Sequence, residues 1–270
     1  MFWVVQDNIF EEHQHDVLLH ALESRNIPYS EVKVIPFYDK LLPSHFDSNL
    51  YQGAIDEIEE EFIDNSGLVM VSGSLALGRI ANERGWNPGS FLNDNFHYNN
   101  WLNAYGNHLL NHESVIDTFQ QINPPWDTFF IRPCKDNKDF NGTVHTQESF
   151  NAWREDELSR HCEFKTSEVV ASPFIPLQAE YRFFVVDGKV ITYSQYKKDF
   201  CLFKSADVPF DVIAFAQKMV DKWQPARAFV IDIATTPHGL KVIEINNFNS
   251  AGFYLADVEK IVEAIEEMIY

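Results

Sequence analysis

Cysteine is scarce in this 270-residue sequence, which contains only Cys134, Cys162 and Cys201. No two of them form a Cys-x-x-Cys pair or another short spacing typical of zinc ligands. We therefore expect neither a disulfide framework nor a structural zinc site. A chain with so few thiols is typical of a reducing compartment.

Positive charge is also in short supply. Lysine and arginine total 21 against 40 aspartates and glutamates, which gives a formal net charge of −19. Binding along a nucleic-acid backbone needs many phosphate contacts from cationic side chains. A broad nucleic-acid interface is therefore not expected, although a few local cations can still hold a small phosphorylated ligand.

Long apolar runs are absent as well, and no basic segment followed by an apolar one opens the chain. A membrane-spanning helix needs about 20 predominantly apolar residues, and a secretory leader has a charged region before its apolar core. The sequence therefore predicts no membrane association and a cytoplasmic location.

What the chain does contain is enough apolar sequence for a large core, because 45% of its residues are hydrophobic. Apolar runs predict strands at 2–5, 29–37 and 67–71, and helical spacing predicts a helix at 14–24. A strand, helix, strand order favours a parallel sheet with a right-handed crossover. We expect an open α/β domain over residues 1–123 and a second domain over 124–270.

The most informative stretch is the pair of apolar runs on either side of Pro237-His238-Gly239. With a three-residue loop, Ile233 would pair with Ile243, Asp232 with Glu244, and Val230 with Asn246. Directly opposed residues share a face of a sheet, and so do residues two apart on one strand.

The predicted hairpin therefore gathers oxygen-bearing side chains from Asp232, Glu244 and Asn246. Such ligands suit Mg²⁺ completed by phosphate and water. Two other interpretations stay open, namely a solvated acidic hairpin and the Asp…Glu-x-Lys arrangement of metal-dependent nucleases with Asn246 in place of the lysine.

Cations gather in the middle of the chain. The predicted strand Thr128–Pro133 carries Arg132 at its end, where a guanidinium can meet a phosphate with two hydrogen bonds. Lys138 follows in a loop. Farther on, Glu180 and Arg182 share a face of one predicted strand, and Lys197 returns on the next strand after an Asp-Gly turn.

The order of these features resembles the ATP-grasp fold over residues 127–270. The resemblance rests on Arg132-Pro133, an apolar hinge at 171–175, Glu180-x-Arg182, and Asp232 followed by Glu244-x-Asn246. It implies an N-terminal open parallel α/β domain followed by an ATP-grasp domain of antiparallel sheets and helices.

Four shorter motifs narrow the resemblance. The segments 85–89 (Gly-Trp-x-Pro-Gly), 130–133 (Phe-Ile-Arg-Pro), 138–142 (Lys-x-Phe-x-Gly) and 180–183 (Glu-Tyr-Arg-Phe) are similar to the arginine/lysine-exchanged clade of ATP-grasp proteins. In that clade an arginine replaces a usual phosphate-binding lysine. Its members come from bacteria and phages and are thought to be peptide or amino-acid ligases.

The resemblance implies ATP and Mg²⁺ as cofactors, with a role for each matching residue. Arg132, Lys138, Arg182 and Lys197 would face the phosphates, and Glu180 would bind the ribose hydroxyls. Adenine would meet the hinge, formed by Ala171, Ser172, Phe174 and Ile175. Magnesium would be held by Asp232, Glu244 and Asn246. The hinge departs from the family pattern, because Ser172-Pro173 replaces a more familiar acidic-basic pair.

The implied reaction joins a small-molecule or peptide carboxylate to an amine through an acyl-phosphate, with release of ADP and phosphate. Arg132, Arg182 and Lys197 would be its catalytic residues, because they neutralise phosphate charge as it develops. The alternatives are a nucleotide-binding protein without ligase activity and a metal-dependent nuclease. The sequence does not name the two substrates.

Overall fold

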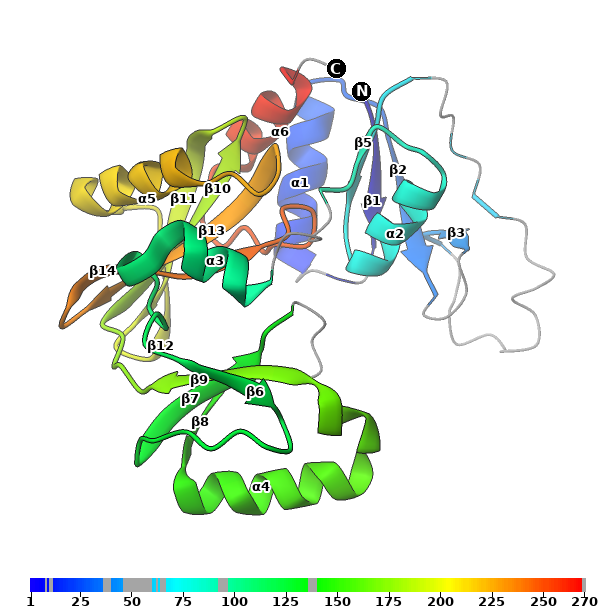
Figure 1. The fold of residues 1–270 in the computed structure, drawn as a ribbon. Helices are drawn as coiled ribbons and strands as arrows, with labels where there is room; N and C mark the ends of the chain where they lie inside the picture. The colour runs from blue at the N-terminus through cyan, green and yellow to red at the C-terminus, as the bar shows by residue number, and fades with distance from the viewer. Residues whose placement is uncertain are drawn as a thin grey trace.

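The computed structural model describes residues 1–7, 9, 12–35, 40–45, 60, 61, 63, 67–91, 97–135 and 140–268. Lys138 lies outside these residues. Three sheets organise the described part of the chain (Figure 1). None of the helices that the structure describes combines the length and the apolar composition needed to cross a membrane.

The first sheet has the strand order β3-β2-β1-β4-β5. Its strands are β1 (Phe2–Gln6), β2 (Tyr29–Val34), β3 (Leu41–Pro43), β4 (Val69–Ser72) and β5 (Pro88–Gly89), and its helices are α1 (Glu12–Ser24) and α2 (Leu75–Glu83). β1 runs parallel to both β2 and β4, which confirms the predicted β-α-β unit, whereas β3 is antiparallel to β2.

The second sheet is antiparallel, with the order β12-β11-β10-β13-β14. Its strands are β10 (Ala179–Val186), β11 (Lys189–Lys198), β12 (Cys201–Ser205), β13 (Ala228–Thr236) and β14 (Gly239–Asn246). Strand β12 was not anticipated from the sequence.

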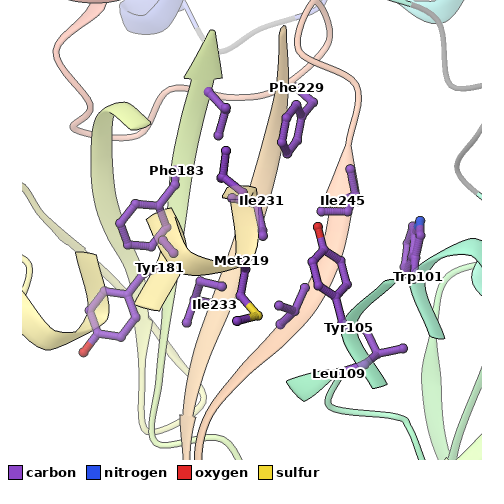
Figure 2. Close-up of a cluster of buried hydrophobic side chains, with 14 of the residues drawn as sticks. Trp101, Tyr105, Leu109, Tyr181, Phe183, Met219, Phe229, Ile231, Ile233 and Ile245 are labelled. Carbon is purple, nitrogen blue, oxygen red and sulfur yellow. The ribbon is translucent and has the colours of Figure 1, made fainter. Parts of the chain in front are cut away.

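Both faces of this second sheet are covered. Phe183 and Ile231 pack on one face with residues of α3 (Tyr98–Tyr105) and α5 (Phe210–Lys222), and Figure 2 shows part of this cluster. Their chain neighbours Phe184 and Val230 point to the other face, where α6 (Val258–Glu266) and the first sheet pack. Because successive strand residues alternate between faces, both faces of the sheet are apolar.

The third sheet has the order β6-β9-β7-β8 and lies apart from the first (Figure 1). It comprises β6 (Val115–Thr118), β7 (Thr128–Pro133), β8 (Thr143–Thr146) and β9 (Glu168–Pro173), with α4 (Gln147–Arg160) beside it and the 3₁₀ turns η2 (Gly106–His108) and η3 (Cys162–Thr166). β6 precedes the expected domain boundary at 123/124, yet it pairs with β9.

The hairpin β13–β14 differs from the predicted register in its loop. Thr236 pairs with Gly239, so the loop has two residues instead of three, and Ile233 pairs with Val242 instead of Ile243. A register shift between Asp232 and Ile233 then restores the predicted pairs Asp232–Glu244 and Val230–Asn246. The bulge adds the residue that the shorter loop removes, and bulges are common beside active sites.

Two buried asparagines attach the end of β14 to the first sheet. The Asn249 amide donates to Val71 O at 2.7 Å and its Oδ1 accepts from Phe91 N at 2.9 Å. The Asn247 amide donates to Phe91 O at 2.6 Å, and Gly73 N donates to Asn249 O at 2.9 Å. The loop after β14 is therefore fixed to the carboxyl end of β4.

We expect Asn249→Ala to lower the free energy of unfolding by about 1–3 kcal/mol, because it leaves the buried Val71 O and Phe91 N without a partner. Urea denaturation measures the change. Asn103→Ala, at an exposed position of α3, is the matched control and should be close to neutral. Equal effects from the two substitutions would contradict the role given to Asn249.

Candidate active site

A cavity of about 680 Å³ lies between the second and third sheets. Eight of the residues predicted from the sequence line it, namely Arg132, Phe174, Ile175, Glu180, Arg182, Lys197, Glu244 and Asn246. Three others, Ala171, Ser172 and Asp232, are buried behind the lining. Residues from distant parts of the sequence thus face one space.

Arg182 and Asp232 form the central ion pair of the cavity. They are directly opposed on β10 and β13. Arg182 Nε donates to Asp232 Oδ1 at 3.0 Å and Nη2 donates to Oδ2 at 2.8 Å, which makes the pair bidentate. The side chain of Asp232 has no exposed surface, so the guanidinium provides the compensation that a buried carboxylate requires.

Burial and pairing act in opposite directions on these two groups. Burial raises the pKa of Asp232, and the nearby Arg182 opposes that shift without cancelling it. Burial alone would lower the pKa of Arg182, but the Asp232 carboxylate and the neighbouring tyrosines hold that pKa above its usual value. The guanidinium therefore stays charged at any pH at which the protein is folded.

A second ion pair connects the second and third sheets. Arg132 Nη1, on β7, donates to Glu244 Oε2, on β14, at 3.3 Å. The Asn246 amide lies between the two carboxylates and donates to Asp232 Oδ2 and Glu244 Oε1, each at 3.1 Å. The three residues predicted to hold magnesium therefore form one connected cluster.

A third ion pair joins two neighbouring strands. Glu180 and Lys197 are opposed on β10 and β11, with Lys197 Nζ at 3.4 Å from Glu180 Oε1. Tyr196 donates from its hydroxyl to Glu180 Oε2 at 2.8 Å. Burial raises the pKa of Tyr196 well above its ordinary value, and the Asp232 and Glu180 carboxylates add to that shift. Tyr196 therefore remains a neutral donor that holds the carboxylate in place.

The donor set fits Mg²⁺. Glu244 and Asn246 face the cavity, and the Asn246 amide fills a position between two carboxylates that a cation could take. A half-turn of that amide would present Oδ1 instead of Nδ2. Mg²⁺ commonly uses one or two carboxylates together with waters and substrate phosphates. Asp232, which is buried and bonded to Arg182, would act from behind these two residues.

The predicted hinge is partly exposed to the cavity. Pro173 and Phe174 line it, whereas the Ser172 hydroxyl points away and donates to Asn111 Oδ1 at 3.0 Å. At Pro173 the neighbouring strand β6 has already ended, so the missing backbone N–H interrupts no pairing with β6. Apolar side chains around the hinge form the wall of the cavity, from Leu110, Phe130, Val144, Ile175 and Leu177.

Sequence reasoning missed several residues of the site. Tyr254 and Tyr196 stack at 4.9 Å beside Arg182, and the indole of Trp101 lies 4.7 Å from the Arg132 guanidinium carbon. Tyr254 also holds a left-handed backbone with φ of 53°, which is uncommon for a bulky residue. No spacing signal in the sequence connects these aromatic residues to the distant arginines.

We expect Arg182→Met to lower the free energy of unfolding by about 3–5 kcal/mol, because it leaves the Asp232 carboxylate buried without a cation. Asp232 would then have a still higher pKa in the folded than in the unfolded state. The folded protein would bind more protons, so the stability of the variant falls as pH rises through that range.

Chemical denaturation at pH values from about 5 to 8 checks both effects. The double variant Arg182→Met/Asp232→Asn removes the unpaired charge and should recover part of the stability and lose the added pH dependence. A single variant as stable as the wild type at all these pH values would show that the pair has no such role.

Comparison with known proteins agrees with the geometry. Residues 56–265 match the family described as the ATP-grasp domain of the arginine/lysine-exchanged clade, family 3. No curated protein matches the sequence.

Solved structures with the same fold include the D-alanine–D-alanine ligase from Helicobacter pylori, with a TM-score of 0.63, 15% identity and coverage of 99% of this chain and 98% of that chain. The enzyme of the same name from Bacillus anthracis, complexed with ATP, gives 0.58, 14%, 98% and 96%. The ATP-grasp ligase PsnB, complexed with a minimal precursor, gives 0.55, 13%, 98% and 97%.

These identities show a shared fold, and the family match covers most of the chain. The protein belongs to family 3 of the arginine/lysine-exchanged clade of ATP-grasp proteins.

Proposed function

We propose that the protein is an ATP-dependent carboxylate–amine ligase that forms an amide or peptide bond through an acyl-phosphate. The observation that carries the proposal is the cavity in which three cations and three carboxylates from five strands form ion pairs. Family membership supports ATP as the nucleotide, and the similar structures described as ligases support the reaction class.

The cavity has two chemically different parts that suit a nucleotide. Phe174, Ile175 and Leu177 supply an apolar wall for adenine next to the Ala171-Ser172 backbone. Glu180, held by Tyr196 and Lys197, supplies a carboxylate for the ribose hydroxyls. The triphosphate would extend from there toward the ion pairs of β7, β10 and β14.

The charged part would carry the chemistry. The substrate carboxylate attacks the γ-phosphorus, the bond to ADP breaks, and an acyl-phosphate forms. An amine then attacks the acyl carbon and phosphate leaves. Arg132, Arg182 and Lys197 would stabilise the charge on the transferring phosphoryl group and hold the reacting groups in line. Lys138 is proposed to assist from its loop.

Glu244 and Asn246 would hold magnesium, with Asp232 behind them. When bound, Mg²⁺ would neutralise phosphate oxygens and orient the triphosphate. The nuclease alternative is less well supported, because it needs an accessible aspartate next to Glu244. Here Asp232 has no exposed surface and both its oxygens are bonded to Arg182.

Calorimetric titration of ATP with Mg²⁺ tests the nucleotide site. We expect saturable binding to the wild type and a loss of affinity of about tenfold or more in Glu244→Gln, where a charged metal ligand becomes neutral. Glu259→Gln, an equal change of charge at an exposed position of α6, is the matched control. Absence of binding to the wild type would overturn the proposal.

Release of ADP tests the ligase activity separately from binding. We expect ADP to form in the presence of a carboxylate and an amine substrate, and we expect hydroxylamine to trap the acyl-phosphate as a hydroxamate when it replaces the amine. Screening amino acids and short peptides in pairs would identify the substrates. A protein that binds ATP without forming ADP or hydroxamate with any pair would be a nucleotide-binding protein, not a ligase.

A further inference from the structure

Trp101 contacts the site from an element outside both sheets that form the cavity. It lies on α3 and is 1% exposed. Its ring centroid is 4.7 Å from the guanidinium carbon of Arg132. Figure 2 shows Trp101 at one end of the buried cluster that α3 forms against the second sheet. The indole is thus part of a packed core on one side and supports a charged side chain on the other.

The guanidinium of Arg132 is held on several sides. Nη1 donates to Glu244 Oε2 at 3.3 Å and Nε donates to Pro133 O at 3.4 Å, while the indole covers one face. A guanidinium has five N–H donors, so these two contacts leave donors for a phosphate. The side chain is only 14% exposed, which favours a single orientation toward the cavity.

Packing alone orients the indole. Its Nε1 has no hydrogen-bond partner among the described residues, so the ring face rather than the N–H is the group in use. A planar guanidinium can lie flat on an aromatic face and still donate in its own plane, whereas the lysine ammonium is a point charge on a flexible stem. An aromatic residue at position 101 therefore suits arginine at 132 better than lysine.

We propose that Trp101 is the positioning residue for Arg132, and that the aromatic support from α3 is what makes arginine effective at the phosphate position of this chain. The inference rests on the proposed function. It gives α3, which precedes the domain boundary expected from the sequence, a direct role in nucleotide binding. The indole acts through the guanidinium and does not itself contact the nucleotide.

A double-mutant cycle on ATP binding with Mg²⁺, followed by calorimetry, tests this inference. We expect Trp101→Leu to weaken binding by about tenfold, and Trp101→Phe, which keeps an aromatic face, by less than about threefold. In an Arg132→Ala background, Trp101→Leu should change the affinity by less than about twofold, because the group that it positions is gone.

Tyr105→Leu is the matched control. Tyr105 lies one turn farther along α3, is equally buried and also has a polar atom without a partner among the described residues, but it packs against Trp223. If Tyr105→Leu weakens ATP binding as much as Trp101→Leu, or if Trp101→Leu has the same effect with and without Arg132, the indole is merely a core residue and the inference is wrong.

The wild type and Arg132→Ala separate this outcome from failure of the proposed function. No ATP binding by the wild type would refute the nucleotide site itself. Binding that Arg132→Ala weakens but Trp101→Leu leaves unchanged would refute only the role of Trp101. Thermal unfolding of every variant, including Trp101→Phe, shows which affinities come from folded protein.

Discussion

The ion pair between Arg182 and Asp232 is the interaction on which the site depends. Asp232 lies on a central strand with no exposed surface, and a carboxylate in that position is unfavourable unless it is paired and hydrogen-bonded. The opposed position on β10 supplies a bidentate guanidinium. Once this pair is in place, Asn246 is held against Asp232 and Glu244, and Glu244 is set to meet Arg132 from the other sheet. The cavity is therefore a consequence of charge pairing across adjacent strands.

The architecture keeps these pairs in register by fixing both faces of the second sheet. One apolar face packs on α3 and α5, the other on α6 and the first sheet. The loop after β14 is hydrogen-bonded to β4 and to Phe91 through Asn247 and Asn249. A displacement of the first sheet would thus pull on the strand that carries Glu244 and Asn246. This connection gives the N-terminal α/β part a mechanical link to the proposed metal ligands.

Much of the fold was predictable because its signals are local. The β-α-β unit, most of the long strands and the main helices follow from apolar spacing. The pairs Asp232–Glu244 and Val230–Asn246 were also predicted, but through two errors that cancel: the loop is one residue shorter than expected, and a bulge restores the register. Strand β12 was missed because its alternation is weak and most of its residues are exposed. Trp101 could not be found from sequence, since its role depends on α3 packing beside a strand that is distant along the chain. The roles of the hinge and metal residues stay predictions, because geometry alone does not show what they bind.

The strong negative charge of the chain does not conflict with a site for a polyanion. Charges separated by more than about 8–10 Å in water at physiological salt are largely screened, so the many exposed carboxylates act weakly at the cavity. Inside it, Arg132, Arg182 and Lys197 offset Glu244, Asp232 and Glu180 one for one, and Lys135 also lines the wall. A triphosphate entering with Mg²⁺ would compete for cations that are already positioned rather than recruit mobile ones. Arginine suits this exchange, because its planar array of donors can keep a carboxylate on one side while it accepts a phosphate on another. The price of such preorganisation is a cavity whose charges must be folded into place before any ligand arrives.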